Sequence, residues 1–208
     1  MLGPDEKINY VASNAIIKLL YDQMLKEHED RLSDLKSREV LYVTDLVSCS
    51  HKRELRILYP EIYFRFEPTA ILGGLAHRGL EQYLIEQGFE VEKEFEIPFE
   101  LDERIYRIKG RVDARKEDLV VEIKTARSDQ GIPHLHHVMQ LQVYLVLLDA
   151  AQGILIYITP SRLAEYRIDR VEIDLKTLVE ETVYDLRHPR WSWECKYCPF
   201  SRICAYTT

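Results

Sequence analysis

The chain has 208 residues, of which 46% are hydrophobic and 30% charged, so it can form one domain with a buried core and is not a disordered chain. Its formal net charge of -7 excludes tight non-specific binding of nucleic acid through overall charge alone, so such a role would need a local basic strip or bound metal ions. The longest apolar candidate, 141–158, is interrupted by polar residues, so we expect no membrane span.

The N-terminal part is expected to be helical. Residues 6–36 alternate apolar and charged positions at helical spacing. We expect one buried stripe on this helix, formed by Ile8, Val11, Ile16, Leu19, Leu20 and Leu25. A short strand follows at 40–43. Thr44 is expected to be the N-cap residue of a helix that ends at about Leu58.

A further helix is expected to begin at Pro68, which suits a first helical turn, and to end at Gly88. Gly73 and Gly74 lie inside it and weaken it, which indicates that another backbone or a ligand approaches closely there. The same helix carries His77. A single helical histidine indicates metal binding only weakly.

Three strands are expected in the middle of the chain, at 89–99, 105–114 and 119–125, and the last two should pair with each other. The elements that follow are a helix at 134–150, a buried strand at 153–159, an alternating strand at 163–173 and a helix capped by Asp174. Helices before, within and after a β core predict an α/β fold in which helices flank a central mixed sheet.

The strands expected at 105–114 and 119–125 carry the residues that most favour catalysis. Glu122 and Lys124 are two residues apart on one strand and therefore share a face. If Asp113 of the neighbouring strand lies beside them, two carboxylates can share Mg²⁺ or Mn²⁺. Lys124 would then orient a water molecule or offset charge that develops on a phosphate. The alternative is a cross-strand ladder of Glu and Lys on the surface.

Polar residues near these strands form two further groups. Gln140 and Tyr144 lie four residues apart in an otherwise apolar helix, so they either support a site or are half-buried at an edge. Basic residues on and around the central strands predict a local positive strip: Arg104, Arg107, Lys109, Arg111, Arg115 and Lys116.

Three of the four cysteines, Cys195, Cys198 and Cys204, lie within ten residues, and Cys49 lies far upstream. The first residues lack the basic start and apolar region of a secretion signal. We therefore expect a cytoplasmic protein with reduced thiols, which favours metal binding over disulfides. Four thiolates can bind a tetrahedral zinc ion or a 4Fe–4S cluster, and the spacing leaves both open.

Taken in order, these residues resemble the PD-(D/E)xK nuclease superfamily and, more narrowly, the RecB-like exonucleases associated with CRISPR loci, which carry an iron–sulfur cluster. The resemblance spans residues 44–204 and rests on the ordered set of residues. That set is Cys49, the helical histidine in Gly74 to His77, Asp113, Glu122-x-Lys124, Gln140 with Tyr144, and the three C-terminal cysteines.

The resemblance implies a restriction-endonuclease-like core at 44–190, preceded by an N-terminal helix and lead-in strand at 1–43 and followed by a cysteine-rich tail at 191–208. It implies a divalent metal ion, Mn²⁺ or Mg²⁺, held by His77, Asp113, Glu122 and the main-chain carbonyl of Ile123. It makes Lys124 the catalytic lysine, with Gln140 and Tyr144 supporting the site or contacting nucleic acid. It places a 4Fe–4S cluster at Cys49, Cys195, Cys198 and Cys204.

The activity implied is that of a metal-dependent exonuclease acting on single-stranded DNA ends, which trims DNA before new CRISPR spacers are integrated. The implied partners are DNA, the CRISPR integrase proteins and, in a homo-oligomer, further copies of the chain. One alternative is a non-catalytic nucleic-acid-binding module cross-linked by zinc or an iron–sulfur cluster. Another is an iron–sulfur redox protein. Electron transfer does not require Asp113 and the Glu122-x-Lys124 pair, so these residues do not favour this alternative.

Overall fold

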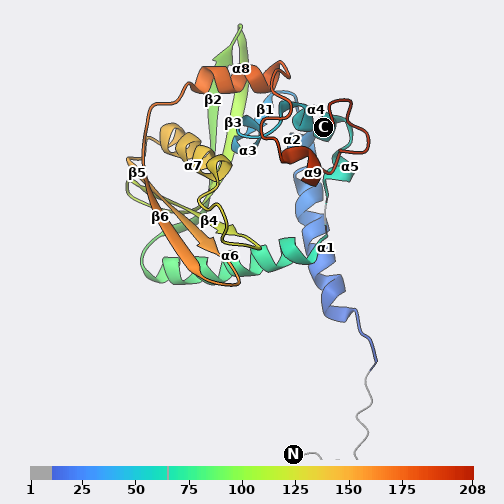
Figure 1. Cartoon of the computed structure of the whole chain (residues 1–208), viewed down its shortest axis with the longest axis vertical. Helices are drawn as coiled ribbons and strands as arrows, with labels where there is room; N and C mark the ends of the chain where they lie inside the picture. The colour runs from blue at the N-terminus through green and yellow to red at the C-terminus, as the bar shows by residue number, and fades with distance from the viewer. Residues whose placement is uncertain (1–10, 65) are drawn as a thin grey trace, which may run out of the picture.

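The computed structural model describes residues 11–64 and 66–208, which form a central mixed sheet flanked by helices (Figure 1). The expected α/β architecture is therefore confirmed. In this part of the chain the strands are β1 (Val40–Tyr42), β2 (Glu90–Leu101), β3 (Arg104–Lys116), β4 (Leu119–Thr125), β5 (Gln152–Ile158) and β6 (Leu163–Asp169). The helices are α1 (Ala15–Asp30), α2 (Leu32–Lys36), α3 (Val43–Leu46), α4 (Ser50–Leu58), α5 (Pro60–Tyr63), α6 (Pro68–Glu86), α7 (Leu135–Leu147), α8 (Leu175–Val183) and α9 (Glu194–Tyr197).

Most elements from α6 onward lie where the sequence predicts them, although β6 is shorter than expected. Gly88 has a φ of 81°, which suits glycine and ends α6 as expected. Asp174 caps α8 by accepting a hydrogen bond from the Thr177 N–H at 3.0 Å. None of the helices in residues 11–64 and 66–208 has the length and apolar character needed to cross a bilayer.

The N-terminal expectation is wrong in two respects. The chain forms two helices there, α1 and α2, and the apolar positions of α1 are not a buried stripe. Val11, Ile16 and Leu19 are 91%, 69% and 64% exposed. Leu20 and Leu25 are half-buried. The N-terminal end of α1 extends away from the sheet, so no layer of the fold covers the apolar positions there (Figure 1). Ile8 lies outside the described residues.

The helix expected to begin at Thr44 is interrupted and starts elsewhere. The carboxylate of Asp45 accepts a hydrogen bond from the Tyr42 N–H at 2.9 Å, so Tyr42 is the N-cap residue of α3. Asp45 also pairs with the buried Arg56 at 2.6 Å, which fixes α3 against α4. The chain then breaks before α4, whose N-cap residue is Cys49. This break places Cys49 at the N-terminus of α4.

Helices α6 and α7 cover opposite faces of the sheet. On one side, Leu80 and Leu84 of α6 pack on Val121 and Ile123 of β4. On the other side, α7 contributes its apolar residues to the larger core, together with α3 and α8. The alternation along β4 therefore turns Glu122 towards α7, and the strand lies between two buried layers.

Strand β3 is where the sheet divides. One edge of β3 pairs with β2. On the opposite edge, β1 pairs with Arg107–Lys109 and β4 with Ala114–Lys116, so residues 110–113 lie where β1 and β4 separate. Val112 packs in the core against α7, whereas Ala114 packs in the core against α6. Residues two apart share a face in a regular strand, so β3 twists strongly between them.

Candidate functional site

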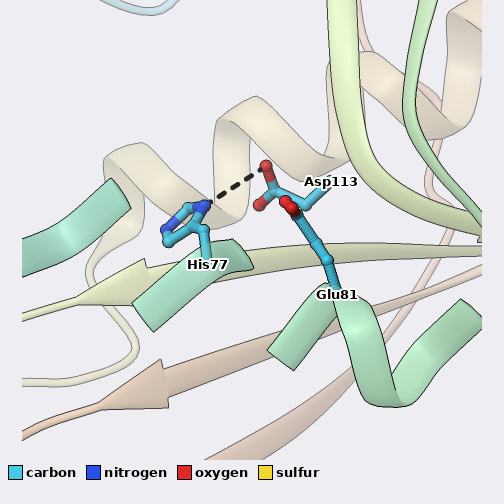
Figure 2. A group of neighbouring side chains, drawn as sticks. All are labelled: His77, Glu81 and Asp113. Carbon is cyan, nitrogen blue, oxygen red and sulfur yellow. Dashed lines mark ion pairs between the residues drawn. The ribbon is translucent and has the colours of Figure 1, made fainter. Parts of the chain in front are cut away.

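Helix α6 and strand β3 bring three potential metal ligands together: His77, Glu81 and Asp113, the α6–β3 ligand group (Figure 2). His77 and Glu81 are four residues apart and lie on one face of α6. The Oδ1 of Asp113 lies 3.5 Å from the Nδ1 of His77. One ligand atom of each side chain lies within 4.8 Å of the others. Glu81 adds to the residues expected from the sequence, and its spacing from His77 is the signal that could have found it.

Helix α6 approaches the end of β4 at a glycine. A Cβ at Gly73 would lie 3.0 Å from the Oγ1 of Thr125, so a larger residue there would require this side chain to shift slightly. The sequence predicts the approach of another backbone or a ligand at these glycines. At Gly73 the neighbour is a side chain instead, and at Gly74 a Cβ would meet nothing within 4 Å among the described atoms.

The carboxylate of Asp113 also reaches β4. Its Oδ2 accepts a hydrogen bond from the Ile123 N–H at 2.6 Å. The β3–β4 ladder ends at Ala114 and Val121, so beyond it a side chain replaces the main-chain acceptor that a paired strand would supply. The division of the sheet thereby fixes Asp113 between β4 and α6.

Glu122 is held by Lys124 and α7. Its Oε1 accepts hydrogen bonds from the Nζ of Lys124 at 2.5 Å and the Nε2 of Gln140 at 2.9 Å. The Oε1 of Gln140 accepts a further bond from Lys124 at 3.0 Å. Glu122 is only 3% exposed, so the surface-ladder alternative is wrong. Glu122 does not belong to the α6–β3 ligand group, and its Oε2 has no hydrogen-bond partner among the described residues.

Tyr144 supports this arrangement from inside the core, where it is 3% exposed. Its hydroxyl accepts a hydrogen bond from the Nε2 of Gln140 at 3.2 Å and donates one to the Arg111 carbonyl at 3.1 Å. Gly110 leaves room for the ring, because a Cβ there would lie 2.9 Å from Tyr144 and 2.4 Å from Phe95. Tyr144 therefore fixes the Gln140 amide that contacts both Glu122 and Lys124.

The acidic side chains of the site are crowded. Burial raises the pKa of Glu122 to about 7, and Asp113 adds to the shift while Lys124 opposes it. Burial also raises the pKa of Glu81, and neighbouring carboxylates raise it further. Burial lowers the pKa of His77, but Asp113 more than compensates, so this pKa is raised. A divalent cation would stabilise the ionised carboxylates, so the donor set fits Mg²⁺ or Mn²⁺.

The expected positive strip on β3 is neutralised in its middle part, where Arg107, Lys109 and Arg111 have acidic partners. Lys109 lies 2.7 Å from Asp34 and 3.1 Å from Glu96. Arg111 lies 3.1 Å from Glu92. The acidic strand β2 pairs with β3 along its length, so basic and acidic side chains face each other across the ladder. The strip therefore offers DNA less free positive charge than the sequence predicts.

Helix α1 borders the site. A cavity of about 480 Å³ lies between α1 and α6 and is lined by His77, Arg78, Arg111 and Thr125, with Leu20, Gln23, Met24 and Glu27 from α1. Arg78 pairs with Glu27 at 3.7 Å across this cavity. The N-terminal helix thus forms a wall beside the α6–β3 ligand group, a position that its own sequence does not indicate.

All four cysteines border one cavity of about 290 Å³ between α4 and the C-terminal tail. The fold therefore brings the three tail thiols and Cys49 to one place, where they can bind a metal centre together. Burial raises the pKa of the Cys49 thiol to about 11, so a bound metal ion would be needed to hold the thiolate near pH 7.

Glu194 attaches the cysteine-rich tail to α4 independently of the thiols. Its carboxylate accepts hydrogen bonds from the N–H groups of Cys49 at 2.9 Å, Arg190 at 2.8 Å and Trp191 at 2.9 Å. Glu194 is a buried acidic residue that the sequence does not single out. These bonds bring Cys49 to the tail cysteines.

Histidines at the start of α7 lie between Lys124 and the tail. The rings of His136 and Trp193 have centroids 4.6 Å apart, and the Nδ1 of His137 lies 2.7 Å from the Tyr157 hydroxyl. Burial lowers the pKa of His136 to about 4, with a contribution from His134. Burial and the charge of Lys124 lower the pKa of His137 to about 2. Both imidazoles are therefore neutral near pH 7.

These histidines predict a loss of stability in acid. The unfolded chain takes up protons at His136 and His137 below about pH 6.5, whereas the folded chain resists protonation until much lower pH, so stability present above pH 6.5 is lost as the pH falls. We expect the melting temperature to fall between about pH 7.5 and 5. The fall should be smaller in the double variant His136→Gln, His137→Gln. Equal slopes in the two proteins would contradict this assignment.

Comparison with known proteins agrees with this geometry. The family model for the PD-(D/E)XK nuclease superfamily matches residues 19–205. The CRISPR-associated exonuclease Cas4 of Saccharolobus solfataricus is 44% identical over 200 residues, which cover 91% of this chain and 97% of that protein. The crystal structure of SSO0001 matches with a TM-score of 0.81 and 42% identity, over 91% of this chain and 98% of that chain.

A more distant likeness concerns the fold alone. The crystal structure of LHK-Exo in complex with dAMP matches with a TM-score of 0.50 and 15% identity, over 74% of this chain and 88% of that chain. The family assignment rests on the two matches above 40% identity. The geometry agrees with it, because Asp113, Glu122 and Lys124 lie where β1 and β4 separate along β3. The chain belongs to the PD-(D/E)XK nuclease superfamily and, within it, to the family of the CRISPR-associated exonuclease Cas4.

Proposed function

We propose that the chain is a metal-dependent DNA exonuclease that acts on single-stranded ends. The observation that carries the proposal is the buried arrangement of Asp113, Glu122 and Lys124 beside His77, in a chain 44% identical to a CRISPR-associated exonuclease. Buried carboxylates with an unpaired oxygen are unfavourable in a purely structural role. They are suited to a divalent cation and a phosphodiester.

The side chains of His77, Asp113 and Glu122 and the carbonyl of Ile123 would hold Mn²⁺ or Mg²⁺. Such an ion supplies Lewis acidity and lowers the pKa of the attacking water. Asp113 is already fixed by the Ile123 N–H, so its carboxylate needs little reorganisation. The Oε1 of Glu122 is engaged by Lys124. The Oε2 has no hydrogen-bond partner among the described residues, so it would be the oxygen that binds the ion.

Lys124 would stabilise the negative charge that develops on the phosphate. Its ammonium is held at 2.5 Å from Glu122 and 3.0 Å from Gln140, so its position is set before substrate binds. Gln140 is fixed in turn by Tyr144. Gln140 and Tyr144 therefore act as positioning residues in this proposal.

The four cysteines would bind a 4Fe–4S cluster with a structural role. The lining of one cavity by all four thiols supports a shared metal centre. We place the protein in the cytoplasm, where thiols stay reduced and can bind such a cluster. By its likeness to a CRISPR-associated exonuclease, the chain would trim DNA for spacer acquisition with the CRISPR integrase proteins.

Digestion of end-labelled DNA tests the proposal. Protein purified without oxygen should shorten linear single-stranded DNA progressively with Mn²⁺ or Mg²⁺, and not with EDTA. Circular single-stranded DNA is the matched control, because an exonuclease requires an end. Cleavage in EDTA would exclude a metal-dependent reaction. DNA binding without cleavage would favour the non-catalytic binding module.

Lys124→Ala should lower turnover by on the order of 10²- to 10³-fold and change the affinity for DNA little, because the ammonium stabilises mainly the transition state. Single-turnover cleavage and fluorescence anisotropy with the same labelled DNA would measure the two effects. The control is Lys176→Ala on α8, which removes an exposed ammonium. Equal losses in affinity and activity, with unchanged turnover at saturation, would make Lys124 a phosphate-contact residue.

A further inference from the structure

Ring side chains from α7 and the cysteine-rich tail form a row beside the proposed catalytic residues. We name it the α7–tail aromatic row, and its members are His137, His136, Trp193 and Tyr197. The ring centroids of His137 and His136 lie 4.0 Å apart, and those of His136 and Trp193 lie 4.6 Å apart. Tyr197 follows, with its centroid 6.4 Å from that of Trp193. The row therefore joins the first turn of α7 to α9.

The row begins next to the residues that hold Lys124. His136 and His137 lie one helical turn before Gln140. The side chain of Gln140 contacts both Glu122 and Lys124. Gln140 and all four members of the row line the cavity of about 290 Å³ that the cysteines also border. This cavity therefore continues from a residue that positions Lys124 to the rings of the tail.

The two tryptophans of the tail differ in their contacts. The indole N–H of Trp191 donates a hydrogen bond to the Val47 carbonyl at 2.9 Å and so attaches the tail to the end of α3. Trp193 is 41% exposed, and within residues 11–64 and 66–208 no hydrogen bond involves its indole N–H. The ring of Trp193 is therefore held by His136 on one side and is open to a ligand elsewhere.

Positive charge lies beside the row. Lys52 lines the same cavity, and the ammonium of the exposed Lys196 lies 5.5 Å from the centroid of the Tyr197 ring. Neither ammonium forms an ion pair within the part of the chain that the structure describes, whereas Lys109 and Arg111 on β3 are paired. Aromatic rings with unpaired lysines beside them are suited to bases and phosphates of a single strand.

We propose that the α7–tail aromatic row binds bases of single-stranded DNA, next to the bond that is cleaved, by stacking on His136, Trp193 and Tyr197. The inference rests on the proposed function, because the row would receive the strand that the site cuts. Every base has a π face, so such binding tolerates any sequence. The cysteine-rich tail would then contact substrate in addition to stabilising the fold.

Binding of two labelled strands in EDTA, measured by fluorescence anisotropy, tests the proposal without cleavage. One strand is oligothymidine, and the other has the same length but consists of abasic tetrahydrofuran units, which keep the phosphates and remove the bases. Full-length protein purified without oxygen should bind oligothymidine more tightly. Trp193→Ala should raise the Kd for oligothymidine by on the order of 10-fold and leave the Kd for the abasic strand unchanged. Trp193→Phe should keep most of the affinity.

The matched control is Tyr83→Ala, which removes a ring that is 70% exposed on α6 and should change neither Kd. Iron content and a melting curve would show whether Trp193→Ala retains the tail. If it does not, His136→Ala, a change on α7, gives the same comparison of the two strands.

Two results would overturn the proposal. One is an unchanged protein that binds neither strand or binds both equally. The other is a loss of affinity in Trp193→Ala that is the same for both strands or is absent. Both leave the proposed function standing if the unchanged protein shortens linear single-stranded DNA with Mn²⁺. Base-dependent binding that Trp193→Ala removes, without any cleavage, would support the row and contradict the proposed function.

Discussion

Replacing Asp113 with asparagine is expected to lower DNA cleavage by at least on the order of 10³-fold. The change removes a ligand charge from the metal site, and a bound metal contributes several kcal/mol to the stabilisation of the transition state, with about 1.4 kcal/mol for each factor of ten. The fold should be retained, since the asparagine carbonyl can still accept the hydrogen bond from Ile123. Steady-state cleavage of labelled single-stranded DNA and a melting curve measure the two effects.

The control for this experiment is Asp118→Asn. Asp118 lies exposed in the turn between β3 and β4, so the same chemical change is made outside the site. We expect nearly unchanged cleavage. If Asp113→Asn cleaves DNA at the unchanged rate in Mn²⁺, Asp113 is not a metal ligand. Asp113→Asn is a cleaner test than Glu122→Gln, because a glutamine amide at 122 would have to share the buried contacts of Lys124 and Gln140.

Replacement of Cys49 by alanine is expected to release the cluster, bleach the brown protein and lower its melting temperature by about 10 °C. Cys49 and Cys195 are 146 residues apart in the chain, so the proposed cluster would close a long loop. By analogy with a disulfide, such a loop is worth up to about 5 kcal/mol, and about 1 kcal/mol shifts the melting temperature of a chain of this size by about 2–4 °C. Glu194 and its three hydrogen bonds limit the loss.

Ser201→Ala provides the matched control, since Ser201 lines the same cavity and carries no thiol. Iron, acid-labile sulfide and zinc should be measured on protein purified without oxygen. Stoichiometric zinc without iron would show that the cross-link is a zinc site. A colourless, metal-free protein with four alkylatable thiols would exclude both the iron–sulfur cluster and the zinc site. Soluble Cys49→Ala protein should still cleave DNA, because the proposed ligands of the divalent cation lie on α6, β3 and β4.

The exposed face of α1 shows how local pattern and packing differ. Its apolar residues have helical spacing, and α1 is indeed a helix. Burial requires a second surface, and the sheet supplies none at this end of the molecule (Figure 1). Ile16 therefore remains 69% exposed although its sequence context predicts a core position. The spacing of apolar residues predicts which face of a helix is apolar, and it does not predict which element packs against that face.

The sequence by itself predicted strands β3 and β4 and helix α7, the elements that carry the proposed catalytic residues. Glu122 and Lys124 share a face because side chains alternate along a strand, and Gln140 and Tyr144 share a face because they lie one helical turn apart. The ordered set also indicated the family, which the comparisons confirm. These relations depend on spacing within one element or on residue types in order, so they can be read without knowledge of packing.

Only the tertiary structure decided which elements meet. The separation of β1 and β4 along β3 turned Asp113 towards both Ile123 and His77, and the approach of α6 added Glu81. Acidic partners on α2 and β2 neutralised Lys109, and Glu92 of β2 neutralised Arg111. These outcomes depend on distances between segments far apart in the chain, which packing and strand twist set. The periodicity of a single segment carries no information about those distances.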